Sequence, residues 1–301
     1  MQLNWYNPDT EIPDLTGKVI AVTGGTAGIG HAVICELVKH HPKQIYFTGR
    51  SRTQGEKIVA ELSAETIVTF LECDHSSQAS VRAAATRITD ASDSIDIVFC
   101  IAGVMSVPPA VSVDGYEMHM AVNHLAHALL IKMLLPSLLR AAAPRVVITS
   151  SAAFGMHPRG GISFDTLRTP QGGLLEREWR YAQSKLANIL FAAELARRYP
   201  HITALSTHPG VVQTAMLAQQ NALVRLLGSL MQFGTLLTPA QGAYTQLWAG
   251  TASKDVNGAE IVNGEKYDPI GVPGAQTKVS RDAELAGRLW DWTEQAITLQ
   301  Q

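Results

Sequence analysis

Short apolar runs alternate with amphipathic stretches along most of the chain, and this alternation predicts the fold. Six runs have the length and continuous hydrophobicity of strands that are buried on both faces. They cover residues 19–22, 44–49, 66–71, 95–101, 145–149 and 202–207. Helical patterns follow the first five runs, at residues 29–37, 54–62, 77–89, 114–135 and 181–199. Strict alternation of strand and helix predicts an α/β fold with one doubly wound parallel sheet flanked by helices.

No internal repeat or linker-like stretch interrupts this pattern, so we expect a single domain over residues 1–301. Pro136 is expected to end or kink the helix that covers residues 114–135. Residues 155–178 are irregular and rich in Gly, Pro and Arg, which indicates a long insertion. A last helix is predicted over residues 281–299. Its apolar stripe predicts a docking face formed by Leu285, Leu289, Trp292 and Ala296.

The first predicted strand runs into a glycine-rich turn and then a helix, and in this context a glycine pattern indicates dinucleotide binding. The segment reads KVIAVTGGTAGIGHAV from Lys18 to Val33. Gly24 permits a sharp turn, Gly28 lets the backbone approach a pyrophosphate, and Gly30 lets helix and strand pack closely. The phosphates would lie at the helix N-terminus, where free N–H groups favour negative charge. The pattern therefore predicts a Rossmann-type nucleotide site, with a plain loop before a helix as the alternative.

Two side chains on the helix at residues 181–199 suggest acid–base chemistry. Tyr181 and Lys185 are four residues apart and therefore adjacent on one helix face. A tyrosine with an unperturbed pKa of about 10 is a poor base at neutral pH, and a lysine beside it is expected to lower that pKa. Ser151, at the end of a strand, could hydrogen-bond the same substrate oxygen. Taken alone, the Tyr–Lys pair could be a solvated helix pair, but the serine and the nucleotide motif together favour a catalytic site.

These motifs, in this order, resemble the short-chain dehydrogenase/reductase family, in the branch with the glycine spacing TGxxxGxG. The resemblance implies that Tyr181 is the catalytic acid/base and that Lys185 lowers its pKa and holds the nicotinamide ribose. It implies that Ser151 positions the carbonyl or alcohol oxygen. Asn123 matches the helix asparagine that supports a water-linked proton path to the lysine. Residues 209–214 match the PGxxxT segment that holds the carboxamide.

The resemblance also implies the nucleotide contacts, which fall on the glycine turn, the strand ends and the two catalytic helix residues. They are Gly24, Thr26, Ala27, Gly28, Ile29, Gly30, Arg50, Asp74, Ile101, Ala102, Tyr181, Lys185, Val212 and Thr214. The Asn-His run at residues 123–127, the insertion and Trp290 are similar to the retinol dehydrogenase-like branch. The extended sugar-nucleotide epimerase branch fits less well, because it uses the spacing TGxxGxxG and residue 27 is alanine.

One position departs from the family pattern. The family usually has Asn-Ala-Gly after the fourth strand, and this chain has Ile101-Ala102-Gly103. Ile101 cannot supply the side-chain amide that ties neighbouring strands together around the cofactor. Ala102 and Gly103 still permit close backbone approach, so we expect cofactor binding to survive and the enzyme to be active.

The residue after the second strand predicts the cofactor. An acidic residue there would accept the ribose hydroxyls of NAD, whereas an arginine accommodates the 2′-phosphate of NADP. Gly49 occupies the acidic position and Arg50 follows, so NADP is favoured over NAD. The alternative for Arg50 is a solvated loop arginine. Asp74 matches the acidic residue that reads the adenine in this family, and its alternative is a helix cap before Ser76.

Composition narrows the classes of partner. A formal net charge of −2 gives no general attraction to nucleic acid or to an anionic membrane. Residues 1–17 lack the layout of a signal peptide, and no uncharged apolar run reaches the length of a membrane span. Cys35, Cys73 and Cys100 have no metal-like spacing and lie in apolar segments, so we expect a reduced, cytoplasmic protein with buried thiols.

Two further features have more than one interpretation. His119, His124 and His127 lie close together, but no carboxylate or cysteine set accompanies them, so no metal is expected. Residues 221–237 are strongly apolar. They could belong to a substrate lid over residues 215–237, pack as core, or contact a membrane surface. A lid predicts an apolar carbonyl or alcohol substrate, and the sequence leaves a homo-oligomer open.

Two functions follow from these patterns. The first is an NADP-dependent oxidoreductase that transfers hydride between the nicotinamide and a carbonyl or alcohol substrate. The second is a catalytically silent NADP-binding protein that senses redox state. The complete set of Asn123, Ser151, Tyr181 and Lys185 favours the enzyme, whereas Ile101 favours the regulatory protein.

Overall fold

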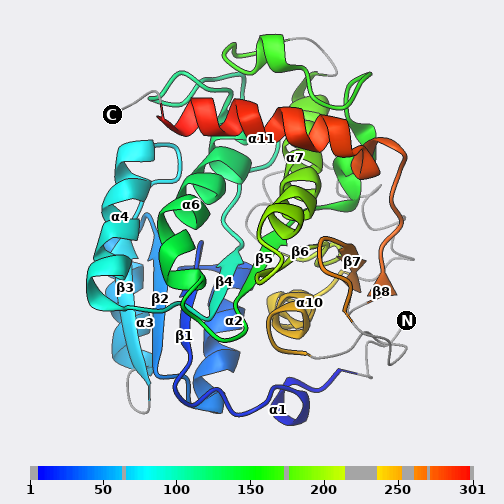
Figure 1. Cartoon of the computed structure of the whole chain (residues 1–301). Coiled ribbons are helices and arrows are strands. Elements are labelled where there is room, and N and C mark those ends of the chain that lie inside the picture. The colour runs from blue at the N-terminus through cyan, green and yellow to red at the C-terminus, as the bar shows by residue number, and fades with distance from the viewer. Residues whose placement is uncertain are drawn as a thin grey trace.

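One twisted sheet with helices on both faces organises the chain (Figure 1). The structure is a computed structural model, and it describes residues 6–62, 66–172, 176–213, 236–252, 261–269 and 272–298. The strand order is β3-β2-β1-β4-β5-β6-β7-β8. The strands are β1 Val19–Val22, β2 Gln44–Gly49, β3 Ile67–Glu72, β4 Ile97–Cys100, β5 Arg145–Thr149, β6 Thr203–Thr207, β7 Lys266–Asp268 and β8 Val272–Pro273. Strands β1 to β7 pair in parallel, and β8 pairs antiparallel with β7.

Helices cover both faces of this sheet. They are α1 Pro8–Glu11, α2 Gly28–Leu37, α3 Arg52–Leu62, α4 Gln78–Ala91, α5 Met118–Met120, α6 Ala126–Leu138, α7 Glu176–Arg198, α10 Pro239–Thr251 and α11 Ala283–Thr298. A π-helical segment, Ala121–Leu125, joins α5 to α6. Short 3₁₀ turns lie at Val38–His40, Ala152–Met156, Phe164–Thr166 and Val279–Arg281.

Alternate residues of the central strands divide the core into two clusters. In β1, Val19 and Ala21 belong to one cluster, and Ile20 and Val22 belong to the other. Successive side chains of a strand point to opposite faces, so each cluster fills one side of the sheet. The first is completed by α4, α6, α7 and α11, and the second by α2, α3 and α10. This arrangement confirms the predicted doubly wound fold.

The six predicted strands are present, with ends that differ by at most two residues from those expected. Four elements were missed, namely α1, β7, β8 and α10. β7 has only three residues, two of them charged, and β8 has two, so neither has an apolar run. The buried face of α10 combines Leu247 and Trp248 with small residues such as Gly242 and Gly250. A side chain at Gly250 would lie 2.2 Å from Phe99 Cζ, so the missing Cβ lets the helix approach the sheet.

Two predicted helices have different limits in the structure. The helix expected over residues 114–135 begins at Met118, passes through the π-helical segment, and continues to Leu138. Pro136 therefore lies inside the last turn and does not end the helix, because it removes only one backbone donor there. α7 begins at Glu176, so the end of the predicted insertion at residues 155–178 is helical. The predicted lid at 215–237 lies outside the described residues, except for Leu236 and Leu237.

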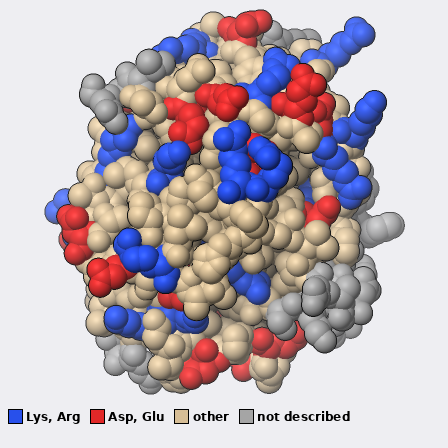
Figure 2. All heavy atoms as spheres, in the orientation of Figure 1, with Lys and Arg blue, Asp and Glu red and all other residues tan. Residues whose placement is uncertain are grey.

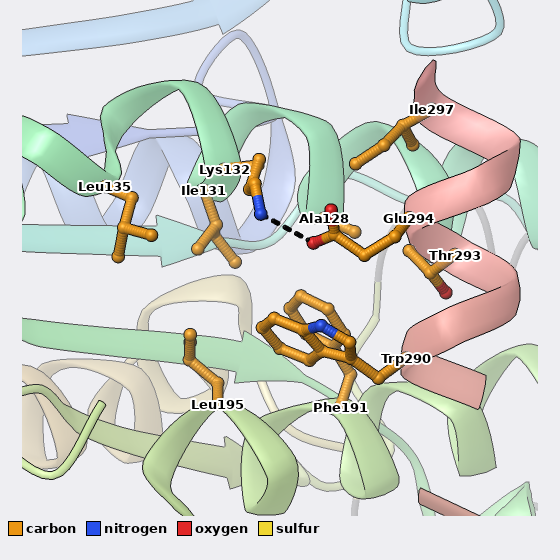
Figure 3. Close-up of a pocket in the computed structure, with 10 residues that line it drawn as sticks. All are labelled: Ala128, Ile131, Lys132, Leu135, Phe191, Leu195, Trp290, Thr293, Glu294 and Ile297. Carbon is orange, nitrogen blue, oxygen red and sulfur yellow. Dashed lines mark hydrogen bonds and ion pairs between the residues drawn. The ribbon is translucent and has the colours of Figure 1, made fainter. Parts of the chain in front are cut away.

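The C-terminal helix α11 crosses α6 and α7, as predicted from its apolar stripe (Figure 1). Leu285, Leu289 and Ala296 are buried, and Trp292 is partly buried. Figure 3 shows the seam, where the rings of Phe191 and Trp290 stack with centroids 4.9 Å apart. The cavity in this seam measures about 10 Å³, which is too small for a substrate, so the seam is a packing interface.

The helical stretch Met118–Leu138 is long and apolar enough to cross a membrane by length and composition. Its most apolar window has a mean hydropathy of 1.3, and 78% of that window is buried inside the protein. Packing in the core therefore accounts for its hydrophobicity. On the face shown in Figure 2, acidic and basic side chains are interspersed, as expected for a net charge near zero.

Candidate active site

The carboxyl ends of four parallel strands meet at one edge of the sheet and carry most of the predicted site residues (Figure 1). β1 leads into Thr23, β4 into Ile101, β5 into Ser151 and β6 into His208. β1 and β4 are neighbours, and the chain builds outward from them in opposite directions. Doubly wound sheets bind ligands in the crevice at such a reversal of strand order.

The glycine turn between β1 and α2 has the shape of a phosphate cradle. Gly24 and Gly28 have φ of +70° and +56°, in the left-handed region. A Cβ at Gly30 would lie 2.3 Å from the Gly24 carbonyl oxygen, so only glycine lets the helix approach the turn this closely. Ala27, the N-cap of α2, offers no side-chain cap, which leaves the first N–H groups of the helix free for an anion. These residues fit a dinucleotide pyrophosphate.

The neighbouring turn residues join this cradle to the sheet. A Cβ at Gly49 would lie 2.4 Å from Thr26 Cγ2, so Thr26 packs directly against the end of β2. Ile29 is partly buried and packs against the hydrophobic cluster on the α2 side of the sheet. The cradle is therefore held by both the second strand and the core beneath it.

Arg50 and Asp74 follow β2 and β3 at the same edge. Arg50 is exposed, and it forms no hydrogen bond or ion pair with the residues that the structure describes. Arg52, by contrast, pairs with Glu72 at 2.8 Å. Asp74 Oδ1 accepts hydrogen bonds from the backbone N–H and the hydroxyl of Ser76, at 2.9 and 2.8 Å. The N-cap of α4 is Ser77, so Asp74 forms a side-chain turn ahead of the helix and is not its cap. Arg50 is available to a ligand.

Backbone contacts replace the side-chain amide that Ile101 lacks. The N–H groups of Ile101 and Ala102 donate to Thr23 Oγ1 at 2.8 and 3.0 Å, and so tie the ends of β1 and β4 together. The Ile101 side chain packs against the core on the α2 face. Sequence reasoning missed Thr23, although its place directly after a buried strand was a visible signal.

Asn123 lies in the π-helical segment and is fully buried. Its Oδ1 accepts from the Val104 N–H at 2.7 Å, and its Nδ2 donates to the Val104 carbonyl at 3.0 Å and to Ser184 Oγ at 2.9 Å. Single π turns inside α-helices occur often at functional sites. Asn123 thereby joins the loop after β4 to α7, one residue before Lys185.

Ser151, Tyr181 and Lys185 come together where β5 meets α7. Ser151 lies close enough to Tyr181 to lower the pKa of its hydroxyl, and Lys185 Nζ lies 5.6 Å from the centre of the Tyr181 ring. Lys185 is buried, and its Nζ donates to the Thr149 carbonyl at 3.1 Å. Ser150 Oγ donates to the Lys185 carbonyl at 2.8 Å. The end of β5 thus holds this turn of α7 from two sides.

Burial dominates the ionisation of this group. Desolvation lowers the pKa of Lys185 to about 8. Desolvation also raises the pKa of Tyr181, and the hydrogen bond with Ser151 opposes that rise. In this structure the Lys185 ammonium is directed to the Thr149 carbonyl, and the expected lowering of the Tyr181 pKa by Lys185 stays a prediction.

Residues 211–213, which follow β6, pair with Leu237, which precedes α10. Val212 forms a parallel bridge with Leu237, and Gln213 N donates to the Leu237 carbonyl at 2.8 Å. Residues 212–213 and 237 therefore lie side by side at this edge of the site. Val212 is buried against Gly242 of α10. Thr214, the other predicted contact in this segment, lies outside the described residues.

A buried charged group beside Tyr181 was also missed. Glu117 Oε1 lies 2.8 Å from His119 Nδ1 and 3.4 Å from Arg180 Nη1, and all three side chains are buried. The His119 ring packs edge-on against Tyr181, with centroids 6.1 Å apart. Burial acts to raise the pKa of Glu117, but hydrogen bonds from His119 and the Met120 N–H keep it below its usual value. Glu117 and Arg180 match no known sequence motif, so they could not be identified from the sequence.

The three histidines considered for a metal have separate partners. His119 contacts Glu117, His124 contacts Thr293, and His127 contacts Thr23. Among the residues described, no cluster of three or more His, Cys, Asp or Glu side chains has a metal-binding arrangement.

Comparisons with known proteins agree with this geometry. The sequence profile of the short chain dehydrogenase family matches residues 18–164. Human retinol dehydrogenase 11 is 35% identical over 287 residues, which cover 94% of this chain and 86% of that protein. A crystal structure of an uncharacterized protein from Mycobacterium paratuberculosis has a TM-score of 0.72 and 26% identity over 96% of both chains. A blue fluorescent protein from a metagenomic library, in complex with NADPH, has a TM-score of 0.66 and 25% identity, over 87% of this chain and 100% of its own.

Proposed function

This chain belongs to the short-chain dehydrogenase/reductase family of enzymes, and on that premise we propose that it is an NADP-dependent oxidoreductase acting on an apolar carbonyl or alcohol. The observation that carries the proposal is that Ser151, Tyr181 and buried Lys185 come together beside the glycine cradle, with Lys185 Nζ 5.6 Å from the centre of the Tyr181 ring. The cofactor supplies the hydride when it is bound.

The chain's own residues perform the proton chemistry. Ser151 Oγ holds the substrate oxygen, and the Tyr181 hydroxyl donates its proton to that oxygen in the reductive direction. Lys185, with a pKa of about 8, is mostly cationic at neutral pH and stabilises the phenolate that remains. Asn123 keeps the loop after β4 and the Lys185 turn in contact through Val104 and Ser184.

Three observations support the finer assignments. Arg50 has no partner among the described residues and follows the strand whose end faces the adenosine ribose in this fold, which favours NADP over NAD. The NADPH-bound structural relative is consistent with this choice. The name of the retinol dehydrogenase relative supports an apolar alcohol or its carbonyl product as substrate.

A scan of substrates tests the proposal directly. NADPH oxidation is measured by absorbance with a panel of apolar aldehydes, ketones and quinones, and NADP reduction with the matching alcohols. We expect turnover with at least one apolar carbonyl compound and its matching alcohol. Turnover should be faster with NADP(H) than with NAD(H). Tight NADPH binding without turnover on any compound would instead support the redox-sensing protein.

Replacing Arg50 by Ala tests the cofactor preference. We expect a loss of roughly tenfold in NADPH affinity and almost no change for NADH, because a charge-assisted hydrogen bond to the 2′-phosphate is worth about 1.5 kcal/mol at an exposed site. The loss should shrink as salt is raised. Arg52→Ala is the matched control, since Arg52 is already paired with Glu72. Equal losses for NADPH and NADH, measured by fluorescence titration, would contradict phosphate recognition by Arg50.

The compartment and assembly state are also proposals. Cys73 and Cys100 are buried, Cys35 is partly buried, and all three thiols are unpaired, which fits a cytoplasmic protein. Cell fractionation tests this, and recovery in the membrane fraction would contradict it. The sequence leaves a homo-oligomer open, and sedimentation of the purified protein tests it.

A further inference from the structure

A buried hydrogen-bonded path joins the glycine turn to the helix that carries Asn123. Thr23 Oγ1 lies 2.9 Å from His127 Nε2, and His127 Nδ1 lies 3.0 Å from the Asn123 carbonyl oxygen. Thr23, Asn123 and His127 are at most 2% exposed. Thr23 and His127 are 104 residues apart in the sequence, so the path links two separate parts of the fold.

The partners determine the proton positions along this path. A carbonyl oxygen only accepts, so His127 Nδ1 must carry the hydrogen that it donates to Asn123. Burial lowers the pKa of His127 well below its usual value, which favours the neutral ring. Nε2 then accepts the Thr23 hydroxyl hydrogen at 2.9 Å, in preference to the more distant Phe99 carbonyl at 3.4 Å. The Thr23 oxygen then accepts both N–H groups of Ile101 and Ala102. The Thr23 hydroxyl and both ring nitrogens of His127 therefore all have hydrogen-bond partners.

Both ends of the path lie at proposed functional groups. At one end, a Cβ at Gly24 would lie 2.9 Å from Ala102 Cα, so the Thr23 bonds set the contact between the nucleotide turn and the β4 loop. At the other end, Asn123 holds Ser184, next to Lys185. A buried polar group that loses its partner is costly, so the path resists changes in its length.

We infer that His127 is a positioning residue that sets the distance between the nucleotide-binding turn and the Lys185 end of the site. This role rests on the proposed function, because it concerns how that site is held together. His127 itself reaches neither substrate nor cofactor by these contacts; it acts through Thr23 and Asn123.

The substitution Thr23→Val removes the hydroxyl while keeping the shape of the side chain. We expect NADPH affinity to fall about tenfold and kcat at saturating NADPH to fall about 10- to 100-fold, as small misplacements of catalytic groups do. Thr23→Ser restores the hydroxyl and should restore both values to within about twofold of wild type. A Thr23→Ser enzyme that regains wild-type stability but not wild-type kcat would overturn the inference.

The chain offers a matched control on the same helix. His124 Nε2 bonds Thr293 Oγ1 at 2.8 Å, in the seam with α11 (Figure 3 labels Thr293). Thr293→Val therefore also removes a hydroxyl from a buried histidine, but away from the strand ends. We expect it to lower the melting temperature and to leave NADPH affinity and kcat unchanged. Equal effects of Thr293→Val and Thr23→Val on these two values would show a general loss of packing and overturn the inference.

A measurement on the wild-type protein decides the matter even if Thr23→Val does not fold. Long-range ¹H–¹⁵N NMR spectra report which imidazole nitrogen carries hydrogen, and the path requires the neutral Nδ1–H form of His127 at pH 7. The Nε2–H form would overturn the inference. This result is independent of turnover, so an inactive wild-type enzyme would refute the proposed function without altering the test of His127.

Discussion

Tyr181→Phe is expected to lower kcat by about 10²- to 10⁴-fold and to leave the NADPH dissociation constant within about twofold of wild type. The substitution removes one oxygen, and that oxygen is the proposed proton donor to the substrate. Ser151 Oγ accepts from the Ala153 N–H at 3.2 Å, so the loop after β5 keeps this contact in the variant. Steady-state kinetics and fluorescence titration of NADPH measure the two effects separately.

Tyr199→Phe supplies the control for this experiment. Tyr199 lies directly after α7 and packs against Trp290, away from the strand ends. The same loss of a phenol oxygen there should leave kcat unchanged. A Tyr181→Phe enzyme with wild-type kcat would rule out Tyr181 as the acid/base, and a parallel loss of NADPH affinity would indicate a structural role.

Stability is expected to fall steeply as the pH drops from 6.5 to about 4. Burial lowers the pKa of His75, His124 and His208 to about 4, and it also lowers that of His127 well below its usual value. The unfolded chain therefore binds protons first, near pH 6.5, and each folded-state pKa is depressed. The stability from each neutral histidine is complete above pH 6.5 and is lost as the pH falls toward 4. For each histidine with a pKa of about 4, this loss is at most roughly 3 kcal/mol.

Urea unfolding followed by circular dichroism, from pH 7.5 to 4.5, measures this loss. Because whole domains have about 5–15 kcal/mol of stability, we expect unfolding without denaturant before pH 4. His124→Gln should reduce the slope of the unfolding free energy against pH by up to the contribution of one proton. His41→Asn is its control: His41 is exposed at φ +58°, a conformation that Asn tolerates, and its removal should leave the slope unchanged. A flat curve between pH 7 and 5 would mean that these histidines are accessible to protons in the folded state.

Much of the fold follows from local sequence patterns. A strand buried on both faces needs a continuous apolar run, and a helix between strands needs an apolar stripe, so both leave a signal over a few neighbouring residues. The six strands and the α2 turn were therefore predicted within narrow limits. The glycine turn was readable for a similar reason, because a backbone approach as close as that at Gly30 excludes every other residue.

Contacts between distant residues were decided by the tertiary structure alone. β7 forms because its backbone pairs with β6, so it needs no apolar run of its own. α10 lies against the sheet because its glycines let the helix approach closely. The π turn at Asn123 and the burial of Glu117 beside Tyr181 likewise depend on what packs around them.

The same holds for the chemistry of the site. Residue types and spacing by themselves indicated a tyrosine, a lysine and a serine at one edge of a nucleotide-binding sheet. They could not indicate that desolvation raises the pKa of Tyr181 against the hydrogen bond from Ser151, since burial and the direction of the Lys185 ammonium arise only when β5 and α7 meet. Nor could they pair Thr23 with His127, because a hydrogen bond across 104 residues exists only once β1, β4 and the Asn123 helix are packed together.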